Sequence, residues 1–171
     1  MKKILLYSFL IYITFFSSLT SARYLMDPMP TKEVAPAFNL VGMDEKFHTM
    51  DEFKGKFVLV NFWATWCHPC KEEMPTLEAI HKIMDNNKFT VLGIHVGPDP
   101  TNIKNFLKIS PVSFPIFIDM DLELNWGVPG LPTTFLIDPD GKMIYRSVGK
   151  RNFASNDMRN FFLKLIKDYS K

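Results

Sequence analysis

Two cysteines, Cys67 and Cys70, are the residues whose type and spacing most directly indicate chemistry. They are the only cysteines of the chain, and His68 and Pro69 separate them. The apolar run 57–63 precedes them, and apolar residues at helical spacing follow. This order predicts a dithiol at a strand-to-helix turn, where the first N–H groups of the helix lack partners and its positive end favours an anion. We therefore expect Cys67 to have a lowered pKa and to be reactive as a thiolate.

Three other uses of such a cysteine pair fit this sequence less well. A structural disulfide that closes so short a loop removes little unfolded-state entropy, equivalent to about 2 kcal/mol. A structural zinc site needs about four ligands, and the chain offers only two thiols. Haem attachment requires a histidine directly after the second cysteine, where Lys71 stands. The motif beside a strand–helix unit therefore favours thiol–disulfide redox chemistry.

The composition is that of one globular domain without a charge pattern for nucleic acid. The chain has 171 residues, of which 47% are hydrophobic and 22% are charged. Its net charge of +2 comes from Lys2 and Lys3, because without these two the 20 basic residues fall to 18, equal to the 18 acidic ones. A neutral body without a basic run indicates no nucleic-acid partner.

Residues 1–22 predict a signal peptide or a membrane anchor. Two lysines supply a positive start, residues 4–16 are uncharged and largely apolar, and small residues dominate 17–22. Cleavage after Ala22 is the simplest interpretation. The alternative is a retained anchor, because 4–22 carries no charge and approaches the ~20 residues that span a bilayer. Both interpretations place the body in the periplasm or an equivalent extracytoplasmic space, where one close cysteine pair is expected of a catalyst rather than of a stapled scaffold.

A linker and one domain follow this segment. Residues 23–36 contain three prolines and predict the linker, and residues 37–171 carry alternating strand and helix signals. The expected elements are a hairpin at 37–50, strands at 57–63, 89–96, 114–118, 133–137 and 143–148, helices at 70–85, 100–109 and 155–169, and a helical turn at 122–126. Such a chain predicts an α/β fold with a central mixed sheet flanked by helices on both faces.

The sequence from about residue 35 to the end resembles the thioredoxin superfamily, in particular its extracytoplasmic TlpA/ResA-like branch. The stretches that carry the resemblance are 35–40 (APAFNL), 54–56 (KGK), 60–70 (VNFWATWCHPC), 73–75 (EMP), 127–138 (GVPGLPTTFLID) and 140–141 (DG). The resemblance implies a thioredoxin-like fold with an N-terminal β-hairpin and a βα insertion at about 98–119.

The resemblance also implies roles for the dithiol and for a distant proline. Cys67 is expected to attack a substrate disulfide and Cys70 to resolve the mixed disulfide, and the reverse steps would oxidise a substrate. The Leu131-Pro132 peptide is expected to be cis and to lie beside the dithiol, since X-Pro bonds adopt cis at low cost. The missing proline N–H would leave the backbone of the preceding residue free to pair with an extended substrate.

Glu73 is the expected proton carrier for Cys70. Thioredoxin has a buried Asp at the position of Asn61, and an amide cannot take a proton. Glu73 lies three residues after Cys70, on the same helix face one turn on. The resemblance implies that the matching glutamate carries the proton in this branch. The alternative is that Glu73 is an ordinary charge on the helix surface.

Residues next to the cysteines are expected to bind the substrate. Trp66 should pack beside the sulfurs as part of the docking surface. His68 and Pro69 should set the redox poise, because a cationic His68 would stabilise the Cys67 thiolate. His68 could equally be a solvated loop residue.

The expected function is a thiol–disulfide oxidoreductase of the cell envelope that reduces disulfides in exported proteins. A membrane thiol electron donor would keep the dithiol reduced. One familiar job of this branch is the reduction of apocytochrome c, but Thr133 stands where that subgroup often has an acidic residue, so the substrate is open. We expect no cofactor other than the redox-active Cys67–Cys70 disulfide and no metal, because His48, His81 and His95 have no second ligand at metal spacing.

Two alternatives come from other functional classes. A peroxiredoxin requires a Thr three residues before the reactive Cys and a Pro four residues before that, where this chain has Ala64 and Val60. A thioredoxin-like copper chaperone uses two cysteines separated by three residues plus a distant His. The spacing here is one residue too short, and His95 would be the histidine to test.

Overall fold

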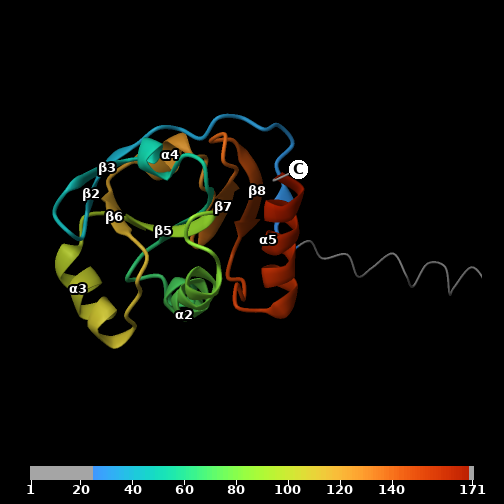
Figure 1. The fold of residues 1–171 in the computed structure, drawn as a ribbon. Coiled ribbons are helices and arrows are strands. Elements are labelled where there is room, and N and C mark those ends of the chain that lie inside the picture. The colour runs from blue at the N-terminus through green and yellow to red at the C-terminus, as the bar shows by residue number, and fades with distance from the viewer. Residues whose placement is uncertain (1–24, 170–171) are drawn as a thin grey trace, which may run out of the picture.

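The computed structural model describes residues 25–169 (Figure 1). The predicted signal peptide or anchor and its cleavage site after Ala22 lie outside these residues. Within 25–169, no helix is long and apolar enough to cross a membrane.

The described chain folds around one mixed sheet of eight strands in the order β1-β8-β7-β4-β5-β6-β2-β3. β4 pairs in parallel with β5, and β5 in parallel with β6, whereas the other pairings are antiparallel. The strands are β1 (Asp27–Pro28), β2 (Asn39–Gly42), β3 (Phe47–Thr49), β4 (Phe57–Trp63), β5 (Phe89–Val96), β6 (Ile116–Asp119), β7 (Thr133–Ile137) and β8 (Met143–Val148).

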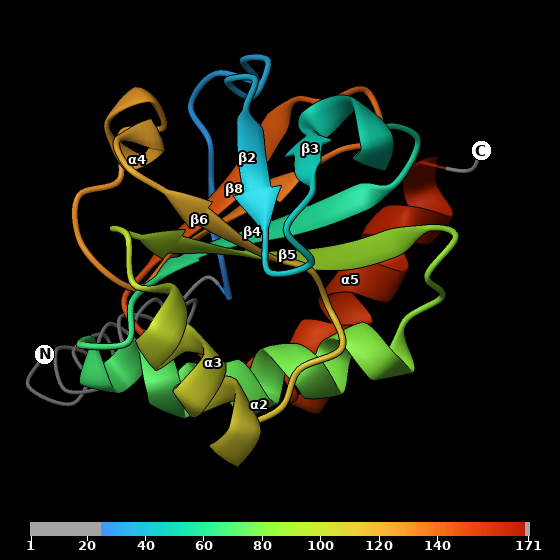
Figure 2. The same cartoon turned by 90° about the vertical axis from the view of Figure 1, so that its left-hand side faces the viewer.

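Helices cover both faces of this sheet, so the predicted α/β architecture is confirmed (Figures 1 and 2). One face carries α2 (His68–Ile83), α3 (Pro100–Ile109) and α5 (Asn156–Tyr169), and buried residues of all three join one apolar cluster. The other face carries the 3-10 helix η1 (Met50–Phe53) and the short α4 (Leu122–Asn125), which pack on a second cluster.

Strand β4 lies at the centre of the sheet and leads to the cysteines. All of its residues are buried, as expected of a near-continuous apolar run that is covered on both faces. After Trp63 the chain turns, and α2 begins at His68 with Cys67 as its N-cap residue and Pro69 in its first turn. The helix was predicted to start at residue 70; it starts two residues earlier because Cys67 itself caps it. The buried residues Met74, Leu77 and Ile80 then hold α2 against the sheet.

The segment predicted as a linker contributes to the sheet. Asp27 and Pro28 pair with Arg146 and Tyr145 on the edge of β8, and Val34 forms an isolated bridge with Lys142. Three prolines favour a linker in the sequence, yet an edge strand also tolerates proline because one side of it forms no ladder.

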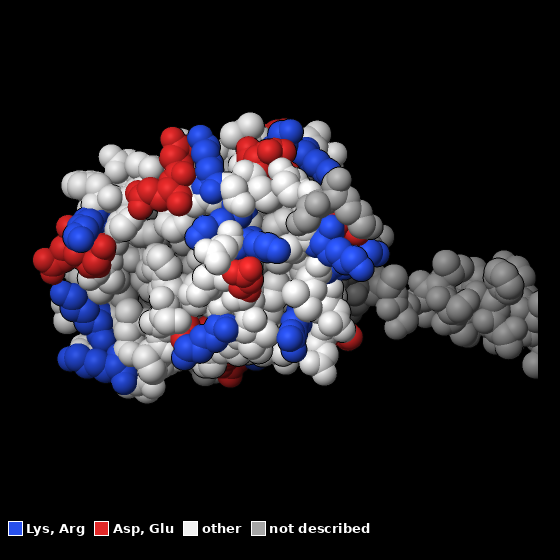
Figure 3. All heavy atoms as spheres, in the orientation of Figure 1, with Lys and Arg blue, Asp and Glu red and all other residues white. Residues whose placement is uncertain are grey.

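Charges of both signs are distributed over the surface. On the face shown in Figure 3, acidic and basic side chains of the described residues lie interspersed. This face of the described residues therefore presents no extended field of one sign to a charged partner.

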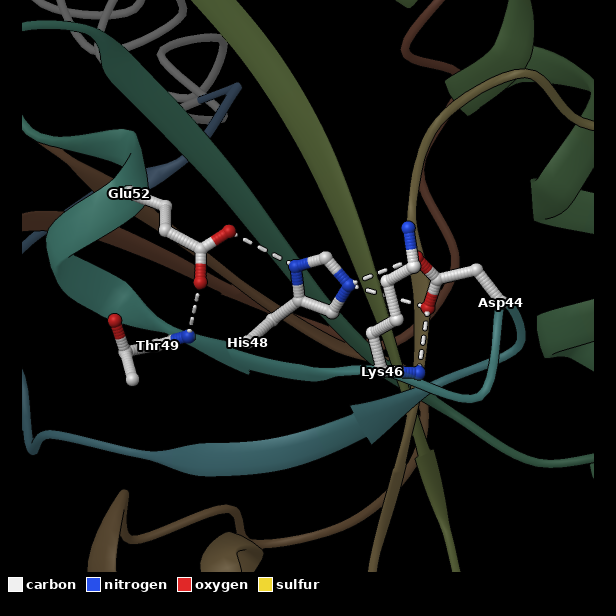
Figure 4. A network of polar contacts seen from close by, with 5 residues as sticks. All are labelled: Asp44, Lys46, His48, Thr49 and Glu52. Atoms are coloured by element: carbon white, nitrogen blue, oxygen red, sulfur yellow. Dashed lines mark hydrogen bonds and ion pairs between the residues drawn. The ribbon is translucent and has the colours of Figure 1, made fainter.

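A charged network secures the β2–β3 hairpin to η1 (Figure 4). The His48 Nδ1 atom lies 2.9 Å from Glu52 Oε2, and its Nε2 atom lies 3.1 Å from Asp44 Oδ2. Glu52 also accepts from the backbone N–H of Thr49, and Asp44 from that of Lys46. The hydrogen bond to Glu52 raises the pKa of His48, the contact with Asp44 adds to this rise, and burial partly opposes it.

We expect His48→Gln to destabilise the domain at mildly acidic pH. A raised pKa in the folded state means that His48 contributes stability below its ordinary pKa of about 6.5, and that this contribution is lost as the pH rises through the folded-state pKa. Urea unfolding of both proteins should therefore give a lower midpoint for the variant at pH 5.5 and nearly equal midpoints at pH 9. A deficit of the same size at both pH values would contradict this role.

Candidate active site

Cys67 and Cys70 form a disulfide at the start of α2, with their Cα atoms 5.3 Å apart. The backbone N–H of Cys70 donates to the sulfur of Cys67 at 3.3 Å. Cys67 is 6% exposed and Cys70 is 1% exposed, so Cys70 is the more buried of the two. The predicted placement of the pair at a strand-to-helix turn is confirmed, and the Cys67 sulfur faces an N–H group of the first helical turn, which favours an anion there.

The Leu131-Pro132 peptide bond is cis, as the resemblance implied. Thr133, the next residue, lies opposite Phe62 in the β4–β7 register, so this proline sits level with the end of β4, where the chain turns toward Cys67. Leu131 packs against the apolar cluster that contains both cysteines. The carbonyl oxygen of Pro132 accepts from the N–H of Gly149 at 2.8 Å, which fixes this turn to the chain that follows β8.

Glu73 is buried one helical turn after Cys70, so the alternative of a surface helix charge is wrong. Its side chain is 1% exposed. One carboxylate oxygen accepts from the backbone N–H of Arg151 at 2.6 Å, and the other accepts from Asn61 Nδ2 at 2.9 Å. Burial raises the pKa of Glu73 to about 7, although both hydrogen bonds act in the opposite direction. A carboxyl group with this pKa can take up and return a proton near neutral pH.

Asn61 connects this carboxyl group to β7. Its amide nitrogen donates both to Glu73 and to the hydroxyl of Thr134, which lies across from it in the β4–β7 register. All three side chains are buried. Asn61, which stands where thioredoxin has an aspartate, therefore serves as a hydrogen-bond donor that holds Glu73 in place.

Trp66, His68 and Pro69 form an exposed rim around the buried sulfurs. Trp66 is 69% exposed, so its ring is accessible to a partner. The His68 imidazole lies 3.3 Å from Glu72, whose other carboxylate oxygen contacts Lys150. A protonated His68 would therefore have a carboxylate partner of its own and act less strongly on the Cys67 sulfur.

Several contacts of the site have no signal in the sequence. Arg151, which lies 78 positions after Glu73, stabilises it through its backbone N–H. Because any residue except proline has such an N–H, the residue type at this position gives no signal. His95 is buried, and both of its ring nitrogens form hydrogen bonds, one with Thr65 and the other with Gly97. Neither nitrogen is thus available to a copper ion in this conformation. Within residues 25–169, no group of three or more His, Cys, Asp or Glu side chains could hold a metal.

Comparisons with known proteins agree with this site. Residues 30–160 match the model of the Redoxin family. The thiol-disulfide oxidoreductase ResA of Geobacillus thermodenitrificans (strain NG80-2) is 37% identical over 135 residues, which cover 78% of this chain and 74% of that protein. ResA of Bacillus subtilis (strain 168) is 35% identical over 135 residues, with the same coverage of 78% and 74%.

A solved structure extends the agreement to the fold. The crystal structure of a thiol:disulfide interchange protein of the thioredoxin family from Chlorobium tepidum TLS superimposes with a TM-score of 0.67 at 30% identity, covering 82% of this chain and 97% of that one. Together with the Cys67–Cys70 pair at the start of α2, these relatives show the reaction class, which is thiol–disulfide interchange. The chain belongs to the Redoxin family and is a ResA-like thiol-disulfide oxidoreductase of the thioredoxin superfamily.

Proposed function

We propose that this protein is a reductase of the cell envelope that reduces disulfides in exported proteins. The observation that carries the proposal is the buried Glu73, which lies one helical turn behind Cys70 and has a pKa of about 7. A buried thiol such as Cys70 can attack only after it loses its proton, and in this proposal Glu73 receives that proton.

The reaction divides between the two sulfurs. The Cys67 thiolate attacks one sulfur of the substrate disulfide, the substrate S–S bond breaks, and the other sulfur leaves as a thiolate that takes a proton from solvent. Cys70 gives its proton to the Glu73 carboxylate and attacks the Cys67 sulfur of the mixed disulfide. The bond between Cys67 and the substrate breaks, and the second substrate sulfur leaves as a thiolate that takes the proton from Glu73. The Cys67–Cys70 disulfide forms, and two electrons have passed to the substrate. A membrane protein that carries a thiol pair would return the enzyme to its reduced form by the reverse steps.

The rim and the cis peptide supply the docking edge in this proposal. Trp66 offers an exposed aromatic surface, and His68 and Pro69 lie beside it in the exposed rim. Leu131 is partly buried and precedes a residue that has no N–H, which suits pairing with an extended substrate segment. The substrate would thus approach Cys67 between α2 and the turn before β7.

The proposal extends to the substrate and to the compartment. Thr133 follows the cis proline, is fully buried and donates its hydroxyl to the Gly130 carbonyl, so it offers no charge to a partner. Exported proteins with accessible disulfides fit this neutral edge, and apocytochrome c is the first to test. The lysine pair and apolar run of residues 1–22 support an extracytoplasmic location, with the segment either cleaved or kept as an anchor.

Because Cys67 and Cys70 act in different steps, their serine variants should behave differently. Cys67→Ser should lose dithiothreitol-coupled insulin reduction, because no attacking thiolate remains. Cys70→Ser should accumulate mixed disulfides with substrates, visible on non-reducing gels and identifiable by mass spectrometry. The double serine variant is the control and should trap nothing. Full turnover by Cys70→Ser would contradict the two-cysteine mechanism.

The proton role of Glu73 predicts a defect in the second step only. We expect Glu73→Gln to slow attack by Cys70 by about 100-fold, the scale of general-base catalysis, and to abolish the pH dependence centred near pH 7. The step can be measured by loading Cys67 with a thionitrobenzoate group and following release of the coloured thiolate in a stopped-flow instrument.

Glu72→Gln is the matched control for that experiment. Glu72 is the neighbouring glutamate, but it is half exposed and pairs with Lys150 and His68 instead of being buried. The control should therefore keep the pH profile of the unmodified protein. An unchanged profile in Glu73→Gln would show that Glu73 takes no part in the proton transfer.

A further inference from the structure

The loop that carries Cys67 is attached to strand β5 through His95. The backbone N–H of Thr65 donates to His95 Nε2 at 3.0 Å. On the other side of the ring, His95 Nδ1 lies 2.9 Å from the carbonyl oxygen of Gly97. A carbonyl oxygen can only accept, so Nδ1 carries a proton, and Nε2 must be the unprotonated nitrogen that accepts from Thr65. Both hydrogen bonds together require the neutral ring.

The surroundings of His95 hold the ring in this position. The side chain is 0% exposed. The ring packs at right angles against Trp63, with centroids 5.0 Å apart, and Trp63 is both its partner in the β4–β5 register and the last residue of β4. Because β4 and β5 run parallel, both residues lie at the same edge of the sheet, from which the chain continues to α2 (Figure 2).

Thr65 has a second attachment at the start of α3. Its hydroxyl donates to Asp99 Oδ2 at 2.9 Å, and Asp99 is the N-cap residue of that helix. The N–H of Cys67 then donates to the carbonyl oxygen of Ala64 at 3.1 Å, which closes a turn over Thr65 and Trp66. The position of Thr65 therefore determines where Cys67 enters the first turn of α2.

We propose that His95 is a positioning residue for thiol–disulfide interchange. Its neutral ring holds the loop so that the Cys67 sulfur faces the N-terminus of α2. Protonation of the ring releases the loop and slows attack by Cys67. An imidazolium carries N–H groups on both nitrogens, so the backbone N–H of Thr65 would lose its acceptor. The protonated Nε2 would be left with the more distant hydroxyl oxygen of Thr65, at 3.4 Å. The sulfur would then lose its alignment with the Cys70 N–H, and the thiolate would be less stabilised. The inference rests on Cys67 as the attacking sulfur.

The charges around His95 confine this effect to acid conditions. Burial lowers the pKa of His95, while the hydrogen bond to Gly97 and the charge of Asp99 oppose that shift. From the packed elements, β4 contributes the uncharged Trp63 and α3 contributes Asp99. Asp119 of β6 lies opposite Val96 instead of His95 and accepts from backbone N–H groups at the start of α4. At neutral pH the ring is therefore neutral and the loop is held.

Two substitutions separate the effect of the hydrogen bond between Thr65 and His95 from the effect of His95 protonation. His95→Leu removes the acceptor. His95→Gln places an amide oxygen near the position of Nε2, which can accept from Thr65 but takes no proton between pH 5 and pH 9. The readout is the rate at which iodoacetamide alkylates Cys67 in the reduced protein over this range, in a Cys70→Ala background.

In the protein with His95, the logarithm of the alkylation rate should fall by more than one per pH unit at the acid end of the range. The reason is that the Cys67 thiolate becomes protonated and the loop is released over the same pH range. His95→Gln should keep the neutral rate within about twofold and fall with a slope of one. His95→Leu should be about three- to tenfold slower at neutral pH, the scale of one lost hydrogen bond. Equal rates and slopes in all three proteins would overturn the inference.

His81→Leu is the matched control, because His81 is also buried and accepts from a backbone N–H, that of Val91, far from the loop. It should leave the alkylation profile unchanged; a profile like that of His95→Leu would show that any buried histidine gives this effect and would overturn the inference. Nitrogen-15 spectra of the unsubstituted protein give a test independent of folding defects. A proton on Nδ1 and a Thr65 amide signal that moves as His95 titrates would support the inference, and a proton on Nε2 at neutral pH would overturn it.

These outcomes are distinct from failure of the proposed function. If Cys67 of the unsubstituted protein does not react with iodoacetamide, its role as the attacking sulfur fails, and the role of His95 fails with it. If Cys67 reacts but the His95 variants match the unsubstituted protein, only the inference about His95 fails.

Discussion

The burial of one carboxyl group one helical turn after Cys70 is the constraint on which the site depends. Removing Glu73 from water raises its pKa from 4.5 to about 7, which corresponds to about 3 kcal/mol against the charged form. Two N–H groups, from Asn61 and Arg151, keep the charged form accessible. Without them the pKa would lie higher still, and without burial it would lie far below neutral pH. The balance produces a group suited to moving a proton between thiols.

The fold supplies this balance by bringing three distant segments together. Asn61 comes from the central strand β4, Glu73 from the helix that follows it, and the N–H of Arg151 from the loop between β8 and α5. The same strand β4 pairs with β7, so the sheet that positions Asn61 also positions the cis peptide before β7. The proposed proton carrier and the proposed docking edge thus share strand β4 as their support, while Trp66, His68 and Pro69 lie exposed.

The sequence predicts the frame of this molecule better than its contacts. Strands β4, β5, β7 and β8 have the predicted bounds because each is a buried apolar or β-branched run between clear turn signals. Helix α3 begins where the Asp99-Pro100 pair predicts. By contrast, β1 was predicted as linker because local prolines carry no information about an edge strand that forms only by pairing with β8. The burial of Glu73 could be implied only by family resemblance, since its partners include a backbone N–H from 78 residues away. The contact of His95 with the loop has no signal in the sequence, because its partner is another backbone N–H, that of Thr65.

The titration of Glu73 itself tests the central claim most directly. Carbon-13 NMR of the side-chain carboxyl group in the disulfide form, assigned by comparison with Glu73→Gln, reports the midpoint without relying on activity. A midpoint near pH 7 is the result that burial of the carboxyl group predicts. A midpoint near the ordinary value of 4.5 would show that Glu73 is charged throughout the neutral range, and the proton transfer assigned to it would have to be abandoned.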